Sequence, residues 1–120
     1  MNDLTNRAFE FLNQARALFV TGEFKIERRL ENLQFEKRFG LRHEQKKEML
    51  LALIPEDCFS IEPNDNLRYK DAMVYKFKHT YDINSYGEIE RVTAYIKMYL
   101  DEEKAYNTVI VISLHEDNLR

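Results

Sequence analysis

The feature that most constrains the fold is the stretch from Arg91 to Leu100, where apolar side chains alternate with polar or aromatic ones. A period of two is typical of a β-strand with one buried face. Met73–Lys78 also alternates, and Thr108–Leu114 is rich in β-branched residues, so we expect both to be strands. The C-terminal half is therefore predicted to be an antiparallel sheet, with a loop at Asp82–Glu90 and an acidic turn at Asp101–Lys104.

The N-terminal half has the period of a helix instead. Apolar residues recur three and four positions apart from Leu4 to Phe19, which predicts an amphipathic helix that ends at Gly22. Two more helices are expected, one stopped by Gly40 and one stopped by Pro55, which cannot continue a helix. The predicted elements of this half are helices at about residues 4–19, 30–39 and 42–54 and a short edge strand at 24–26.

Helices followed by hairpin-linked strands imply an α+β fold, with the helices packed on one face of a small antiparallel sheet. The chain has 120 residues, which is enough for one domain but too few for two domains that each bury a core. We expect a single domain over residues 1–120, with its helical part at about 1–60 and its sheet part at about 71–118.

Composition narrows the class of protein. Hydrophobic residues make up 44% of the chain and charged residues 32%, a balance that is typical of a globular protein and too apolar for disorder. No apolar run is long enough to span a membrane, and no signal peptide is expected. Cys58 is the single cysteine, so no internal disulfide can form and a reducing, cytoplasmic location is predicted.

Charge is unevenly distributed along the chain. Residues 25–47 contain eight basic and four acidic side chains, a local charge of +4. Residues 48–120 contain eight basic and fourteen acidic side chains, a local charge of −6. Such a separation suits a surface that holds a polyanion, or a charged protein partner. Simple solvation of the helices explains it equally well.

Alternation in the two long strands divides their side chains between two faces, and the face away from the helices, the outer face, is expected to carry cations and tyrosines. Lysines neutralise phosphate and tyrosine rings stack on unpaired bases, so this pattern predicts a surface for single-stranded RNA. A polar outer face is also ordinary in an antiparallel sheet. The predicted outer-face residues are Lys76, Lys78, Arg91, Thr93, Tyr95, Lys97 and Tyr99.

His115 follows the last predicted strand, both faces of which are apolar. Histidine changes its protonation state near neutral pH, so His115 is the candidate for proton transfer. Strict alternation puts His115 on the outer face if Leu114 faces the helices. The two sets would then be Ile110, Ile112 and Leu114 toward the helices, and Val109, Val111, Ser113 and His115 on the outer face.

The remaining titratable residues give weaker signals. His43, His79 and Cys58 do not have the spacing of metal ligands, so neither a metal nor another cofactor is expected. Cys58 is expected to be a small packed residue, because no Cys–His arrangement that would activate a nucleophile is visible. The acidic pairs Glu56–Asp57 and Glu102–Glu103 are expected to lie in exposed turns.

Several short motifs occur in the order in which a known family has them. The segment from about Phe24 to Asp117 resembles the MqsR family of toxins from bacterial toxin–antitoxin pairs, which have the RelE-like ribonuclease fold. The most specific piece is Tyr-Ile-Lys followed by an apolar strand that ends in Ser-Leu-His-Glu. The motifs are Arg28 with Asn32, Gly40-Leu41, Met49–Leu53, Glu56–Phe59, Val74–Phe77, Tyr95–Lys97 and Ile112–Glu116.

The resemblance implies a metal-independent endoribonuclease that cleaves mRNA and is silenced by a cognate antitoxin protein. It implies that Tyr95, Lys97 and His115 are catalytic and that Lys76 is a supporting polar residue on the first long strand.

Three positions depart from the family pattern. Cys58 stands where an aromatic residue is usual, Ser60 replaces a basic residue found in some members, and Leu114 replaces the usual phenylalanine of the last motif. A second interpretation therefore stays open, a catalytically degenerate toxin-like module that binds a protein or RNA through the same surface. A third, a purely structural subunit, explains the uneven charge but not the tyrosines and lysines of the outer face.

Overall fold

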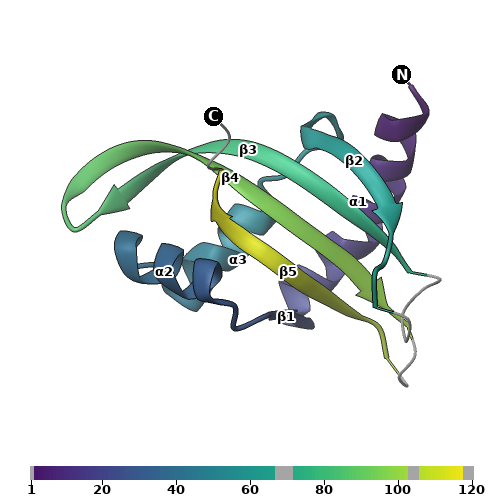
Figure 1. The fold of residues 1–120 in the computed structure, drawn as a ribbon, viewed down its shortest axis with the longest axis horizontal. Coiled ribbons are helices and arrows are strands. Elements are labelled where there is room, and N and C mark those ends of the chain that lie inside the picture. The colour runs from purple at the N-terminus through teal and green to yellow at the C-terminus, as the bar shows by residue number, and fades with distance from the viewer. Residues whose placement is uncertain (1, 67–71, 103–105, 118–120) are drawn as a thin grey trace.

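Three helices lie on one face of a five-stranded sheet, which confirms the predicted α+β fold (Figure 1). The structure is a computed structural model that describes residues 2–66, 72–102 and 106–117. The end of the predicted acidic turn and both ends of the predicted sheet part lie outside these residues. The elements are α1 (Asp3–Thr21), β1 (Phe24–Ile26), α2 (Leu30–Phe39), α3 (His43–Leu51), the short 3-10 helix η1 (Pro55–Asp57), β2 (Cys58–Pro63), β3 (Met73–Ser85), β4 (Glu88–Asp101) and β5 (Thr108–Glu116).

The helices end where the sequence predicts, with one exception. Gly22 and Gly40 follow α1 and α2 with φ angles of 82° and 61°, the left-handed conformation that glycine adopts without steric cost. The third helix is shorter than predicted and stops at Leu51. A residue that precedes proline is forced out of the helical region, and Ile54, before Pro55, is extended with φ −119° and ψ 159°.

The sheet has the strand order β1-β5-β4-β3-β2, and the predicted edge strand β1 is at one end of it. The sheet is mostly antiparallel, and the exception is β1, which runs parallel to β5. Parallel neighbours need a long connection, and here α2, α3 and three strands intervene between the two. The opposite edge is β2, a strand that the sequence did not predict, and its terminal Pro63 suits an edge position.

The expected loop at Asp82–Glu90 is also wrong, because β3 and β4 continue through it to a turn at Tyr86 and Gly87. Both turn residues have positive φ, 51° and 92°, as a two-residue hairpin turn of the mirror-image type requires. The unusual conformation of Tyr86 is held by its hydroxyl, which donates to the Lys37 carbonyl over 2.8 Å. A Cβ atom at Gly40 would lie 3.2 Å from the Tyr86 ring, so α2 and the hairpin tip approach closely.

The main core lies between the helices and the inner face of the sheet. Leu12, Phe19 and Leu50 from the helices and Phe77 and Ile96 from the strands are fully buried there. Each such side chain contributes roughly 1.5–3 kcal/mol to folding. No described helix covers the outer face (Figure 1), and none of the described helices is both long and apolar enough to cross a membrane.

Candidate nucleic-acid interface and catalytic surface

The structure brings Tyr95 and His115 together on the outer face. Tyr95 of β4 lies directly opposite His115 of β5, and their rings stack with centroids 5.4 Å apart and planes 18° apart. Lys78 of β3 lies opposite Tyr95 on its other side. Lys97 lies on the same face two residues along β4, which is about 6.6 Å away along a strand. The three residues predicted to be catalytic therefore occupy one patch.

A bulge in β5 decides the face that His115 takes. Lys97 pairs with Ser113 but the next residue, Met98, pairs with Val111, so Ile112 is an extra residue in β5. Strict alternation therefore fails along this strand. Leu114 faces the core and His115 the outer face, a choice that the sequence left open. Val109 and Val111 face the core and Ile110 and Ile112 the outer face, against the division that strict alternation would give.

Asn32 of α2 holds the bulged part of β5 in place. Its side-chain amide donates to the carbonyls of Ile112 and Glu27, and its side-chain oxygen accepts from the backbone N–H of Leu114, all over 2.9 Å. Asn32 is buried, and it bonds the edge of β5 just beyond the point where β1 ends. The Asn32 side chain thus makes hydrogen bonds to the part of β5 that β1 does not pair with, and these bonds fix the backbone next to His115.

The contacts of the His115 ring leave one nitrogen available for chemistry. Its Nδ1 lies 2.9 Å from the carbonyl oxygen of Glu116. A carbonyl oxygen can only accept, so Nδ1 carries the proton, and in the neutral ring Nε2 keeps its lone pair. The ring is half-buried, and Nε2 is the nitrogen that can take a proton from a ligand.

Lys76 and Lys97 lie directly opposite each other on β3 and β4. Like charges in this position repel unless an anion compensates them. Glu62 of β2 lies 2.7 Å from the Lys76 ammonium and accepts from the Ser60 hydroxyl over 2.6 Å. Hydrogen bonds from Lys76 and then Ser60 lower the pKa of Glu62, and the hydrogen bond to Glu62 raises the pKa of Lys76. Lys97 forms no ion pair with a described side chain.

Phe59 belongs to the same patch, although no sequence pattern places it there. It sits at an irregularity between Cys58 and Ser60 in β2, and 43% of it is exposed. Its ring lies 6.0 Å from the Tyr95 ring, and the Lys78 ammonium lies 4.9 Å from its centroid. Only the unpredicted pairing of β2 with β3 brings it beside Tyr95.

The other predicted RNA-binding residues are distributed along the outer face. Lys78 pairs with Asp117 at 3.4 Å, and the Thr93 hydroxyl shares a 2.8 Å hydrogen bond with Thr80. Arg91 pairs with Asp82 near the hairpin tip, six residues from Lys97 and therefore about 20 Å from it. Arg91 is thus outside the patch.

Tyr99 lies on the outer face as predicted, but it is not an exposed residue there. Only 5% of Tyr99 is exposed, because it packs with Val74 and Ile112 in a small apolar cluster of its own on the outer face. Alternation along β4 placed Tyr99 on the correct face. It could not show that the neighbouring strands also have apolar side chains there.

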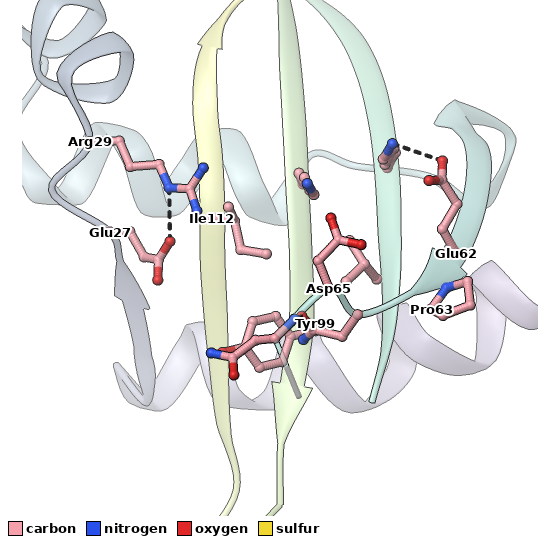
Figure 2. A pocket seen from close by; sticks show the side chains of 12 residues that line it. Glu27, Arg29, Glu62, Pro63, Asp65, Tyr99 and Ile112 are labelled. Atoms are coloured by element: carbon pink, nitrogen blue, oxygen red, sulfur yellow. Dashed lines mark hydrogen bonds and ion pairs between the residues drawn. The ribbon is translucent and has the colours of Figure 1, made fainter. Parts of the chain in front are cut away.

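This apolar cluster is the floor of a hollow of about 420 Å³, which Figure 2 shows from close by. Its rim carries Arg29 with Glu27, 3.1 Å apart, and the Lys76–Glu62 pair. The residues that line the hollow, as defined from here on, are Glu27, Arg29, Glu62–Asn66, Val74, Lys76, Lys97, Tyr99 and Ile112.

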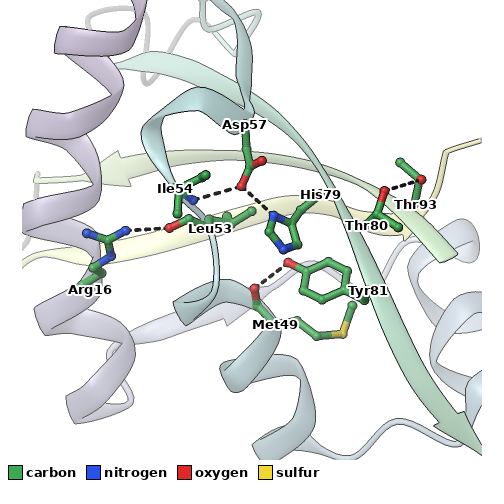
Figure 3. Close-up of polar contacts among 9 residues, drawn as sticks. All are labelled: Arg16, Met49, Leu53, Ile54, Asp57, His79, Thr80, Tyr81 and Thr93. Atoms are coloured by element: carbon green, nitrogen blue, oxygen red, sulfur yellow. Dashed lines mark hydrogen bonds and ion pairs between the residues drawn. The ribbon is translucent and has the colours of Figure 1, made fainter. Parts of the chain in front are cut away.

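A second histidine is paired with a carboxylate, but on the helix side of the sheet (Figure 3). His79 Nδ1 lies 2.7 Å from Asp57, whose carboxylate also accepts from the Ile54 backbone N–H. Asp57 is half-buried, so the expectation that it lies in an exposed turn is wrong. The neighbouring Tyr81 is half-buried and donates to the Met49 carbonyl. These contacts join η1 and α3 to β3 and do not reach the patch around Tyr95.

The remaining residues that the sequence analysis considered, Cys58 and His43, do not form a second functional site. Cys58 is buried in the core, and burial raises the pKa of its thiol, which disfavours the reactive thiolate. Within the described ranges, no three His, Cys, Asp or Glu side chains are grouped as metal ligands would be. His43 lies on the helix side, where its ring stacks on Phe24.

Comparison with known proteins gives no further information on the function of this site. No protein-family model matches the chain, and no curated protein or solved structure is detectably similar to it.

Proposed function

We propose that the chain is a metal-independent endoribonuclease that cleaves mRNA, acting in the cytoplasm as the toxin of a toxin–antitoxin pair. The observation that supports this best is the stacked Tyr95–His115 pair with Lys97 beside it on an uncovered sheet face. The type of reaction is proposed because the motifs around these residues resemble those of the MqsR family.

In the proposed mechanism, Nε2 of His115 takes the proton of a ribose 2′-hydroxyl, and the 2′-oxygen attacks the adjacent phosphorus. Lys97 stabilises the negative charge that develops on the phosphate oxygens. The bond to the 5′-oxygen breaks, and water protonates that oxygen. The products are a 2′,3′-cyclic phosphate and a 5′-hydroxyl. Tyr95 orients the 2′-hydroxyl and holds the His115 ring by stacking against it.

Single-stranded RNA suits the remaining parts of the patch. Phe59 presents an exposed ring next to Tyr95, and base–aromatic stacking contributes roughly 1–3 kcal/mol per base. Lys78 lies over the Phe59 ring and forms an ion pair with Asp117, which a phosphate would have to replace. A cognate antitoxin would silence the enzyme by covering this face.

One observation favours the second candidate, a non-catalytic binding module. Lys76 and Lys78 are each paired with a carboxylate of the same chain, Glu62 and Asp117. Internal pairing of this kind weakens an electrostatic RNA site and suits a surface that a protein partner covers instead.

Incubation of purified protein with single-stranded RNA in EDTA distinguishes the two. The proposal expects cleavage that survives chelation and yields 2′,3′-cyclic phosphate ends, and no cleavage of the same sequence made as DNA, which lacks the 2′-hydroxyl. Intact RNA at high protein concentration contradicts the nuclease and leaves the binding module. Cleavage that chelation abolishes contradicts the proposed mechanism.

A further inference from the structure

The hollow on the outer face has a role that the mechanism above does not use. We propose that it is a nucleotide subsite, which seats one unpaired base on its apolar floor and holds that nucleotide's phosphate at Lys97. The identity of the ligand rests on the proposed function, because the hollow adjoins the surface assigned to RNA.

The floor is unusual for an outer sheet face. Val74, Tyr99 and Ile112 are all buried, and they form a cluster separate from the main core. They lie on three neighbouring strands and pack into one apolar cluster, of which Figure 2 labels Tyr99 and Ile112. The volume of the hollow, about 420 Å³, falls within the roughly 300–1,000 Å³ that small ligands occupy. An apolar cluster bordered by polar side chains suits an unpaired base, which has an apolar face and a polar edge.

The rim determines which part of a nucleotide binds where. Two of its cations, Arg29 and Lys76, are already neutralised by Glu27 and Glu62. Lys97 is the rim cation that pairs with no described side chain, so it is the one free to bind a phosphate. The rim carboxylates accept hydrogen bonds only, and they can bind the N–H groups on the edge of an unpaired base.

The position of the hollow ties it to the proposed reaction. Lys97 lines the hollow and also lies about 6.6 Å along β4 from Tyr95. A nucleotide held in the hollow is therefore the neighbour of the one whose phosphate reaches Tyr95 and His115. The hollow would fix the register of the RNA and select the base next to the cut.

Methyl NMR on the full chain tests the proposal. The four nucleoside 5′-monophosphates and inorganic phosphate are titrated separately, and the methyl signals of Val74 and Ile112 report on the floor. We expect at least one nucleotide, but not phosphate alone, to shift both signals. The exposed Ile89 methyl, at the far end of the hairpin, serves as the control and stays unchanged.

Val74→Phe and Ile112→Phe fill the floor from two different strands. Each should weaken nucleotide binding at least about tenfold, which corresponds to ~1.4 kcal/mol. The other floor methyl remains a reporter in each variant, and thermal melting shows whether the variant is folded. If one variant does not fold, the other gives the answer.

The inference is overturned if phosphate alone reproduces the shifts, if Ile89 responds as strongly as the floor, or if a folded filled variant binds nucleotide as well as the wild type. RNA cleavage by the same preparation is measured in parallel. Floor shifts without cleavage contradict the nuclease and leave the subsite, whereas cleavage without floor shifts contradicts the subsite alone.

Discussion

At the residue scale, replacement of His115 by alanine or of Tyr95 by phenylalanine should abolish RNA cleavage and keep the fold. Both side chains lie on the outer face, so neither change opens a cavity in the main core. Loss of a positioned proton-transfer group slows a reaction by about 100- to 10,000-fold. Cleavage rates in vitro and growth arrest on expression measure the effect.

The matched control is His43→Ala, which removes an exposed histidine on the helix side of the sheet. It should cleave RNA as the wild type does. Equal toxicity of the wild type, His115→Ala and Tyr95→Phe would show that the proposed site is wrong.

Strand alternation placed two of the three residues proposed to be catalytic. Tyr95 and Lys97 could be assigned to the outer face because the alternation along their strand is unbroken up to Lys97. His115 could not be assigned, because the extra residue Ile112 shifts the phase of β5 and nothing in an apolar run shows where a bulge lies. Phe59 was missed because its strand was missed.

Glu62→Gln should strengthen RNA binding. Glutamine keeps the size of the side chain but not the charge, so Lys76 becomes free to bind phosphate. The hydrogen bonds that lower the pKa of Glu62 keep it ionised, so at any pH above its ordinary value of 4.5 the wild type retains the ion pair. Fluorescence anisotropy with a short RNA, repeated at several salt concentrations, should show a slope of log K against log salt that is steeper by about 0.7.

Glu44→Gln provides the control for that charge change, because Glu44 is an exposed residue of α3 on the other side of the sheet. If both variants bind RNA equally, the Lys76–Glu62 pair does not restrain binding and Lys76 is not a phosphate contact.

At the element scale, the helices could be predicted from local residues. The strands and turns that were missed depend on pairing between segments far apart in the chain. Gly22, Gly40 and Pro55 act on their own neighbours, so their effects can be predicted from the sequence. The β2 strand and the parallel neighbour of β1 depend on partners far along the chain. The long β3–β4 hairpin depends on Tyr86, whose positive φ is held by a contact with α2 that no local pattern indicates.

Asn32→Ala should destabilise the protein by about 3 kcal/mol. The change removes three hydrogen bonds and leaves the Leu114 N–H and the Ile112 and Glu27 carbonyls without that partner, and each unsatisfied buried group costs roughly 1–3 kcal/mol. The midpoint of urea unfolding measures the loss.

Asn13→Ala, an exposed position of α1, is the control and should change stability little. A second readout is the His115 ring signal by NMR, which should shift in Asn32→Ala because the backbone that carries it is released. An unfolding midpoint equal to that of the control would show that Asn32 does not fix β5.

At the scale of the whole molecule, the fold should lose stability at alkaline pH. Burial, and secondarily the charge of Asp57, raise the pKa of Tyr81 well above its ordinary value of 10.0. The unfolded chain releases this phenol proton first, so the contribution is complete below about pH 10 and is lost as the pH rises further. Unfolding free energies measured between neutral and alkaline pH should therefore fall above that value.

In Tyr81→Phe the decline above pH 10 should be shallower, although the variant is less stable at neutral pH by about 1 kcal/mol because the Met49 carbonyl loses its partner. Tyr106→Phe, at an exposed tyrosine, should retain the wild-type pH dependence. An identical alkaline slope in Tyr81→Phe and the wild type would exclude Tyr81 as the cause.

The place of β5 in the sheet has a consequence for biosynthesis. This strand is made after every other described helix and strand, yet it lies between β1 and β4 and supplies His115. A ribosome-bound chain from which β5 has not emerged lacks the strand that joins β1 to β4, and its Tyr95–His115 pair is incomplete. Under the proposed function, the RNA-cutting surface therefore forms only after that strand has left the exit tunnel.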